Sequence, residues 1–156
     1  MTPLAWPFAQ WGLDMVGPLQ KSSRGSHTWL LVIVDKFTKW IKAVPVTSAD
    51  ATSAVNFFKS ITCRFGIPHN IITDNGSNFT SGEFQDFCEE RGIQIIYASV
   101  EHPQINVCNG LKKRLLRSIK RAAGAWVEEL PSVLWSLWTT PNRSTQYTPF
   151  FMVYGA

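Results

Sequence analysis

The chain has 156 residues, of which 45% are hydrophobic and 17% are charged, and its net charge is +4. This is the size of one domain with enough apolar side chain for a core, which excludes an intrinsically disordered chain. No apolar run reaches the length of a membrane span, and the N-terminus lacks the layout of a signal peptide. We therefore expect residues 1–156 to form a single domain.

Three strands are predicted in the N-terminal part of the chain. They cover residues 11–16, 28–35 and 40–45, which are rich in apolar and β-branched side chains. The continuous apolar run at 28–35 is typical of a central strand that is buried on both faces. Pro45 is expected to end the third strand, because proline cannot donate a hydrogen bond within a sheet.

Helices alternate with two further strands in the middle of the chain. Apolar residues at helical spacing predict a helix over 48–66, with Ser48 as its N-cap. A strand at 70–73 follows, then a shorter helix over 80–92 that starts at Thr80. A fifth strand is predicted at 93–97.

The remainder of the chain is predicted to be helical. An apolar stripe indicates a helix over 111–126, and a second helix over 128–138 carries Pro131 in its first turn. Three leading strands are typical of an antiparallel meander, whereas the two later strands each arrive through a helix. The predicted fold is therefore α/β, with a five-stranded mixed sheet and helices on both faces.

The positive charge is concentrated in one predicted helix. Between residues 112 and 121 there are six basic side chains and no acid: Lys112, Lys113, Arg114, Arg117, Lys120 and Arg121. The other residues include nine basic and eleven acidic side chains, so this segment supplies the whole positive excess. A solvated helix face would also be rich in lysine, but a cluster of one sign favours contact with the phosphates of a nucleic acid.

The cysteines indicate a reducing compartment. Cys63, Cys88 and Cys108 are widely spaced, no pair has zinc-ligand spacing, and the three histidines are scattered. We therefore expect three free thiols in an intracellular protein of the nucleus or the cytoplasm.

Two acids lie in or directly after predicted strands. Asp14 belongs to the first strand, and Asp74 follows the strand at 70–73 and precedes an Asn-Gly turn. An acid in such a place is more often a turn former than a metal ligand. Two converging aspartates could nevertheless bind Mg²⁺, which prefers oxygen ligands and assists the cleavage or joining of phosphodiesters.

The sequence around these acids resembles one protein family. The strings are, in order, WGLDMVGPL, LLVIVDKFTKW, FGIPHNIITDNGSNFTS, HPQ and ELPSVLWSLWTTPNRSTQYTPFFMVYGA. Together they resemble the integrase catalytic core of Ty3/Gypsy-type LTR retrotransposons, a branch of the retroviral integrase superfamily. The resemblance extends over nearly the whole chain and implies an RNase H-like fold.

The resemblance also implies a site and partners. Asp14 and Asp74 match the first two catalytic acids of the family, which bind Mg²⁺ or Mn²⁺. The basic helix at 112–121 would contact DNA without sequence preference. Integrase cores form dimers, so this chain could form a homodimer, to which Trp135 and Trp138 could contribute. The zinc-binding N-terminal domain and the C-terminal domain of the family are expected to be absent.

The third catalytic acid of the family is missing. The family pattern His-Pro-Gln-Thr-Asn-Gly-Gln-x-Glu puts a Glu 36 positions after the second Asp, where this chain has Gly110. A small deletion after Asn106 would change this register, but no acid occurs anywhere between Glu101 and Glu128. Glu101 is a poor substitute, because it precedes HPQ in a predicted loop and metal ligands need rigid placement.

Three hypotheses follow. The leading one is an integrase core that binds DNA, holds Mg²⁺ or Mn²⁺ weakly, and has lost most or all of its catalysis. The second is an active polynucleotidyl transferase with an unorthodox third ligand. The third is a non-catalytic interaction or decoy domain that uses the integrase fold as a scaffold.

Overall fold

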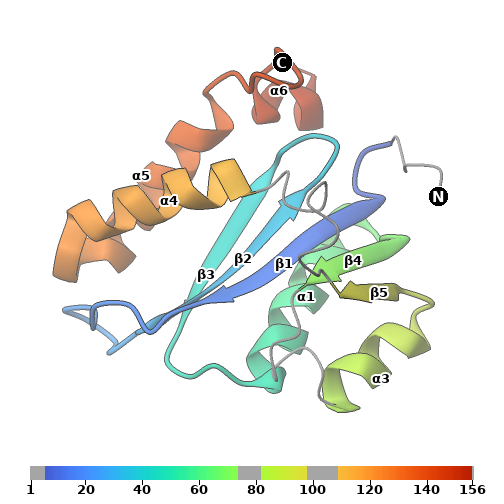
Figure 1. Cartoon of the computed structure of the whole chain (residues 1–156), viewed down its shortest axis with the longest axis horizontal. Coiled ribbons are helices and arrows are strands. Elements are labelled where there is room, and N and C mark those ends of the chain that lie inside the picture. The colour runs from blue at the N-terminus through green and yellow to red at the C-terminus, as the bar shows by residue number, and fades with distance from the viewer. Residues whose placement is uncertain (1–5, 74–81, 98–108, 156) are drawn as a thin grey trace.

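The computed structural model describes residues 6–73, 82–97 and 109–155, which form one sheet covered by helices (Figure 1). The strands are β1 (Gln10–Val16), β2 (Trp29–Asp35), β3 (Ile41–Val46), β4 (Asn70–Thr73) and β5 (Gln94–Tyr97). Their order is β3-β2-β1-β4-β5, with β1, β2 and β3 antiparallel and β4 and β5 parallel to β1. The predicted five-stranded mixed sheet is confirmed.

The helices lie in two groups on opposite faces of the sheet (Figure 1). Helices α1 and α3 cover one face and α4 and α5 cover the other. The helices are α1 (Ala51–Phe65), α3 (Gly82–Glu90), α4 (Asn109–Ala122), α5 (Trp126–Trp138) and α6 (Pro149–Tyr154). Within the described residues, no helix is long and apolar enough to cross a membrane.

Strand β2 is buried on both faces, as its continuous apolar run predicts. Leu31 and Ile33 pack into the core under α1 and α3. The alternate residues Leu30, Val32 and Val34 pack into the second core, under α4 and α5. This alternation follows from the two-residue period of a strand, and it makes β2 the element that both layers share.

Two element ends differ from the sequence-based prediction. The N-cap of α1 is Asp50, not Ser48: the Asp50 carboxylate accepts a hydrogen bond from the Ser53 amide at 2.7 Å, and the Ser48 hydroxyl donates to the same carboxylate. Strand β3 continues through Pro45 to Val46. Pro45 is tolerated there because β3 is an edge strand. The predicted helix start at Thr80 lies outside the described residues.

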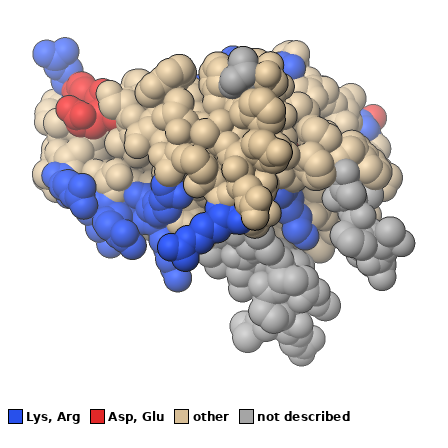
Figure 2. Space-filling model, turned by 90° about the horizontal axis from the view of Figure 1, so that it is seen from above, with Lys and Arg blue, Asp and Glu red and all other residues tan. Residues whose placement is uncertain are grey.

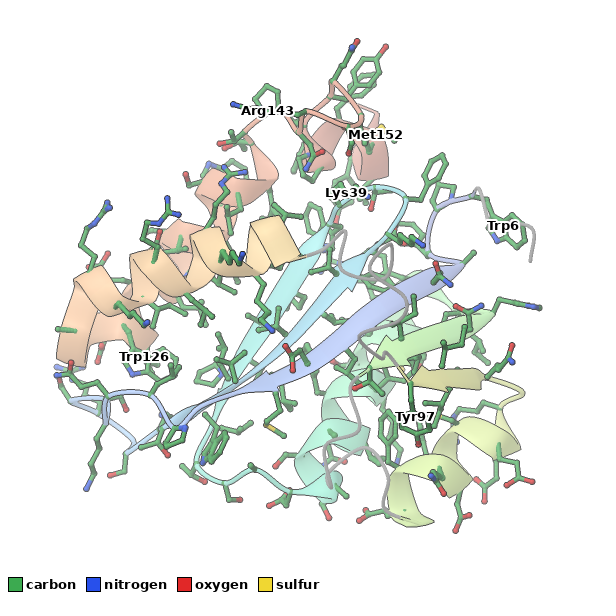
Figure 3. The ribbon with its side chains drawn as sticks, viewed as in Figure 1. Trp6, Lys39, Tyr97, Trp126, Arg143 and Met152 are labelled. Carbon is green, nitrogen blue, oxygen red and sulfur yellow. The ribbon has the colours of Figure 1, made fainter. Side chains whose placement is uncertain are left out.

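The boundary between α4 and α5 also differs from the prediction. Trp126 begins α5 instead of ending α4, because a short 3₁₀ turn with Ala123 at φ +53° interrupts the helix. The amide and hydroxyl of Ser23, in the β1–β2 loop, both donate to the Gly124 carbonyl at 2.9 and 2.8 Å. The Trp126 indole donates to the Gln20 carbonyl at 2.7 Å beside the same loop (Figure 3). Pro131 therefore lies inside α5 and not in its first turn.

A buried carboxylate closes the end of β2. Asp35 accepts hydrogen bonds from the Thr38 hydroxyl at 2.6 Å, the Thr38 amide at 3.0 Å and the Phe8 amide at 3.1 Å. Burial raises the pKa of Asp35, and these hydrogen bonds offset only part of that effect. The protonated form is therefore favoured more strongly in the folded chain than in the unfolded chain.

The sign of this shift gives a prediction for stability. A raised carboxyl pKa contributes stability below the unfolded pKa, and that contribution is lost as pH rises through the folded pKa. The free energy of unfolding of the parent, relative to Asp35→Asn, should fall as pH rises from about 3 through the pKa of Asp35. Urea titrations of both chains across this range measure the difference. A difference that grows with pH would contradict the buried-carboxylate account.

Candidate active site and basic surface

Asp14 lies on β1 and faces the layer that contains α4 and α5. Its strand neighbours Leu13 and Met15 pack toward the opposite core, so the alternation of a strand turns Asp14 the other way. Its Cα pairs with that of Val32 on β2. One carboxylate oxygen, Oδ1, accepts a hydrogen bond from the Met15 amide at 2.9 Å. The second oxygen is free to point at α4.

Lys112 of α4 is bonded to that second oxygen. Its Nζ forms an ion pair and hydrogen bond with Asp14 Oδ2, joining two elements that are 98 residues apart in the chain. The side chains of Lys112 and Asp14 are only 30% and 25% exposed. Such a partly desolvated, charge-assisted hydrogen bond is stronger than an ion pair in open solvent. The predicted catalytic acid and one predicted DNA-binding residue therefore bind each other.

Gly110 lies on a different side of α4. Residues two positions apart in an α-helix are separated by roughly 200° around its axis, so Gly110 and Lys112 face nearly opposite ways. Gly110 is exposed, and a Cβ added to it would meet nothing within 4 Å. Within α4, the helix position that faces Asp14 is 112 and not 110.

The second acid follows the neighbouring strand. Strand β4 runs parallel to β1, with Ile72 opposite Gly12, and ends at Thr73. Asp74 is the next residue, but it lies outside the described residues, as do Glu101 and the HPQ string at 102–104. Asp14 is therefore the only predicted acid whose side chain the structure describes.

The described residues do not fit a two-metal site. They contain no group of three His, Cys, Asp or Glu side chains that could bind a metal ion. Gly110 offers no donor, and Asp14 already binds the Lys112 ammonium. A cation bonded to the carboxylate is a competitor for a divalent ion, because it neutralises the ligand and repels a second positive charge.

The six basic residues of α4 divide into three groups around the helix. With about 100° per residue, Lys113 and Lys120 lie next to Lys112 on the outer side. Arg114, Arg117 and Arg121 lie opposite Lys112, about 140–200° around the axis. Figure 2 shows Lys and Arg side chains in a row along one face of the molecule. Five of the six predicted basic residues therefore form a basic surface, and the sixth, Lys112, is paired with Asp14.

The three arginines line a groove between α4 and α5, which we call the α4–α5 groove. Its volume is about 590 Å³, and its other lining residues are three serines, four apolar residues and a single acid. Besides the arginines the polar lining residues are Ser118, Ser132, Ser136 and Glu129. Guanidinium groups with nearby hydroxyls are suited to phosphate oxygens, which they can bind in pairs.

The two candidate dimer tryptophans differ in their surroundings. The Trp138 ring stacks on Trp40, with centroids 4.3 Å apart, and its indole donates to the Ile41 carbonyl at 2.6 Å. Trp135 is 55% exposed and meets Trp138 and Phe150 only at ring edges. Trp138 is therefore engaged within the chain, whereas Trp135 presents most of its ring to solvent.

The chain matches a known family over most of its length. The model for "Integrase core domain" matches residues 6–103. The Pro-Pol polyprotein of simian foamy virus type 3 is 32% identical over 96% of this chain. The chain belongs to the integrase core family. Its match to the family model ends at residue 103, before α4 begins at Asn109.

Other relatives and solved structures agree with this family. "Gypsy retrotransposon integrase-like protein 1" of Bos taurus is 27% identical over 91% of the chain. The chain spans 13% of the foamy virus polyprotein and 29% of the bovine protein. The HTLV-2 integrase catalytic core domain in complex with magnesium has a TM-score of 0.70 at 22% identity, covering 94% of this chain and 97% of that chain. The RNase H-like fold of an integrase core is thereby established.

A second solved structure is similar over nearly the whole chain. The simian T-cell lymphotropic virus intasome in complex with PP2A regulatory subunit B56 gamma contains a chain with a TM-score of 0.77 and 22% identity. The alignment covers 99% of this integrase core and 57% of that chain. At this identity the likeness establishes the fold alone.

The pairing of Lys112 with Asp14 is not evident from the sequence. In the sequence, Lys112 is one of six similar charges and nothing singles it out. The helical spacing contains one signal, because Lys112 falls beside the apolar residues Leu115 and Ile119 at the edge of the buried stripe. A lysine at that edge reaches Asp14 on β1, whereas Arg114, Arg117 and Arg121 line the α4–α5 groove.

A double-mutant cycle tests the ion pair in this integrase core. The chains are the parent, Asp14→Asn, Lys112→Met and the double variant, and the measurement is the free energy of unfolding in urea. We expect a favourable coupling of about 0.5–1 kcal/mol, which decreases as salt is added. A coupling of zero at low salt would mean that the pair adds nothing to folding.

Proposed function

We propose that this integrase core binds DNA without sequence preference and has lost most or all strand-transfer activity. The observation that carries the proposal is the state of Asp14, whose carboxylate is paired with Lys112 on a helix that offers no acid. The family relationship supports the DNA substrate. Phosphodiester chemistry of this kind uses two metal ions held by carboxylates, and this chain has no acid between Glu101 and Glu128, where the family has its third one.

The DNA surface that we propose is the outer side of α4. Five basic residues face solvent or the α4–α5 groove: Lys113, Arg114, Arg117, Lys120 and Arg121. The arginines can bind phosphates in pairs through their planar guanidinium groups, and the lysines add point charges. None of these contacts reads a base, so binding should depend on charge and salt, not on sequence.

The metal ion of this site would be Mg²⁺ or Mn²⁺, with Asp14 and Asp74 as its proposed ligands, and it could bind Asp14 only after the Lys112 ammonium had left that carboxylate. When bound, such an ion would stabilise charge on the phosphate oxygens. The chain's own contribution is limited to one carboxylate on β1 and one after β4. We also propose a location in the nucleus or the cytoplasm, where retroelement DNA would be met.

Salt dependence of DNA binding gives a prediction. Affinity for a duplex of arbitrary sequence should fall steeply as salt rises, because each phosphate contact releases counterions. In Arg114→Gln/Arg117→Gln/Arg121→Gln, the slope of log K against log salt should decrease by roughly 2 to 3. Fluorescence anisotropy with a labelled duplex measures the slope.

The matched control removes three other exposed charges. Lys59→Gln/Arg64→Gln/Arg143→Gln has the same net charge, but its substitutions lie on α1 and in the loop before α6. We expect its slope to stay within about one of the parent value. Equal losses in the two triple variants would mean that binding follows net charge and not the surface of α4.

Strand transfer with Mg²⁺ or Mn²⁺ tests the loss of catalysis. A missing metal ligand should cost more than the roughly 10–100-fold typical of a lost outer-shell partner, so activity should lie at least about 100-fold below that of an intact integrase core. The assay is strand joining on a labelled substrate. Turnover equal to that of an intact core, and abolished by Asp74→Asn, would instead establish an active enzyme with an unorthodox third ligand.

A further inference from the structure

The ion pair between Asp14 and Lys112 differs from the other charge contacts of the described residues. The other ion pair described, between Arg91 and Glu90, joins sequence neighbours, and its Glu90 side chain is 75% exposed. The pair of Asp14 and Lys112 joins the central part of the sheet to α4 and is mostly shielded from solvent. It also engages an acid that matches a metal ligand of the family.

We propose that Asp14 is a cation site whose resident cation is the Lys112 ammonium, and that it accepts a divalent ion only when Lys112 is removed. This inference rests on the proposed assignment of Asp14 as a metal ligand. It adds that the site is filled by the chain itself. The ligand class that the emptied site would take is a hard divalent cation such as Mn²⁺.

The Lys112 ammonium competes well with a divalent ion for Asp14 because Lys112 is held close to that carboxylate by the packing of α4. Leu111, Leu115 and Ile119 bury one side of α4 against the sheet, so the backbone of Lys112 is fixed near β1. Binding its ammonium to Asp14 is therefore an intramolecular step with a high effective concentration. A divalent ion must lose water, displace the lysine and tolerate its charge nearby, with few carboxylates in return.

The register of α4 decides which substitution would rebuild an acidic site. The Lys112 side chain reaches Asp14, so a glutamate at 112 would present a second carboxylate to the same place. Gly110 lies roughly 200° away around the helix, on the side of the arginines. A glutamate at 110 would therefore point toward the α4–α5 groove and not toward Asp14.

The experiment is a titration with Mn²⁺ alone, with free Mn²⁺ followed by electron paramagnetic resonance. The parent should bind no more tightly than Asp14→Asn. Lys112→Met should bind about tenfold more tightly than the parent, and the gain should vanish in Lys112→Met/Asp14→Asn. Lys112→Glu should bind more tightly again, and more tightly than Gly110→Glu.

Lys113→Met is the matched control, because it removes the same charge one residue away on an exposed position. It should stay within about twofold of the parent. The proposal is overturned if Lys113→Met gains as much as Lys112→Met, if Lys112→Met gains nothing, or if Gly110→Glu gains and Lys112→Glu does not. Circular dichroism of each variant establishes that the sheet and helices are retained.

The proposal can also be tested on the parent chain alone, by NMR in the presence of Mn²⁺, so that this test does not depend on the folding of any variant. Mn²⁺ broadens the NMR signals of nearby nuclei, so binding at Asp14 would broaden the amide signals of Asp14 and Met15. We expect these signals to persist at Mn²⁺ concentrations up to about 1 mM, since the site is filled by Lys112. Selective loss of the two signals overturns the proposal. DNA binding at varied salt is a separate readout, so failure here leaves the proposed DNA-binding function standing.

Discussion

The packing of α4 on the sheet is the constraint from which the other properties of this molecule follow. Leu111, Leu115 and Ile119 are buried against the face of β2 that carries Leu30 and Val32, and this fixes the rotation of the helix about its axis. One basic residue is thereby turned to Asp14, two are turned outward, and three line the groove beside α5. The basic residues are distributed along most of α4 in the sequence, but in the structure the helix has two distinct electrostatic roles. Its inner edge neutralises an acid, and its outer side attracts phosphates.

Most of the fold could be predicted because its signals are local. The apolar run of β2 and the helical stripes of α1 and α4 specify burial directly, and the strand order follows from the helical crossovers. The error at the boundary between α4 and α5 lies where tertiary contacts decide the structure. The break at Ala123 is held by two contacts with the β1–β2 loop: Ser23 of the loop donates to Gly124, and Trp126 donates to Gln20 of the loop. No local sequence pattern reports such contacts. The choice of Asp50 over Ser48 as the N-cap was a local competition between two good capping residues.

The sequence pointed to Asp14 and to the basic residues of α4 as candidates, but not to the contact between Asp14 and Lys112. The motif strings predicted the family, which the family model confirms, and singled out Asp14 as a candidate metal ligand. The lack of an acid between Glu101 and Glu128 is evident from the sequence. The partner of Asp14 was not evident, because charge on a helix is usually solvated and only the rotation of α4 selects Lys112. The same rotation separates position 110 from the acid. Gly110 is assigned by its spacing from the second Asp, whereas Lys112 is the residue of α4 whose side chain contacts Asp14.

Manganese-edge anomalous diffraction from crystals grown with Mn²⁺ tests this account most directly. In the parent, we expect Lys112 Nζ bonded to Asp14 Oδ2 and no manganese at that carboxylate, with an anomalous peak at Asp14 appearing in crystals of Lys112→Met. A manganese ion bound by Asp14 in the parent, with Lys112 turned away from it, would contradict the claim that this integrase core fills its own cation site.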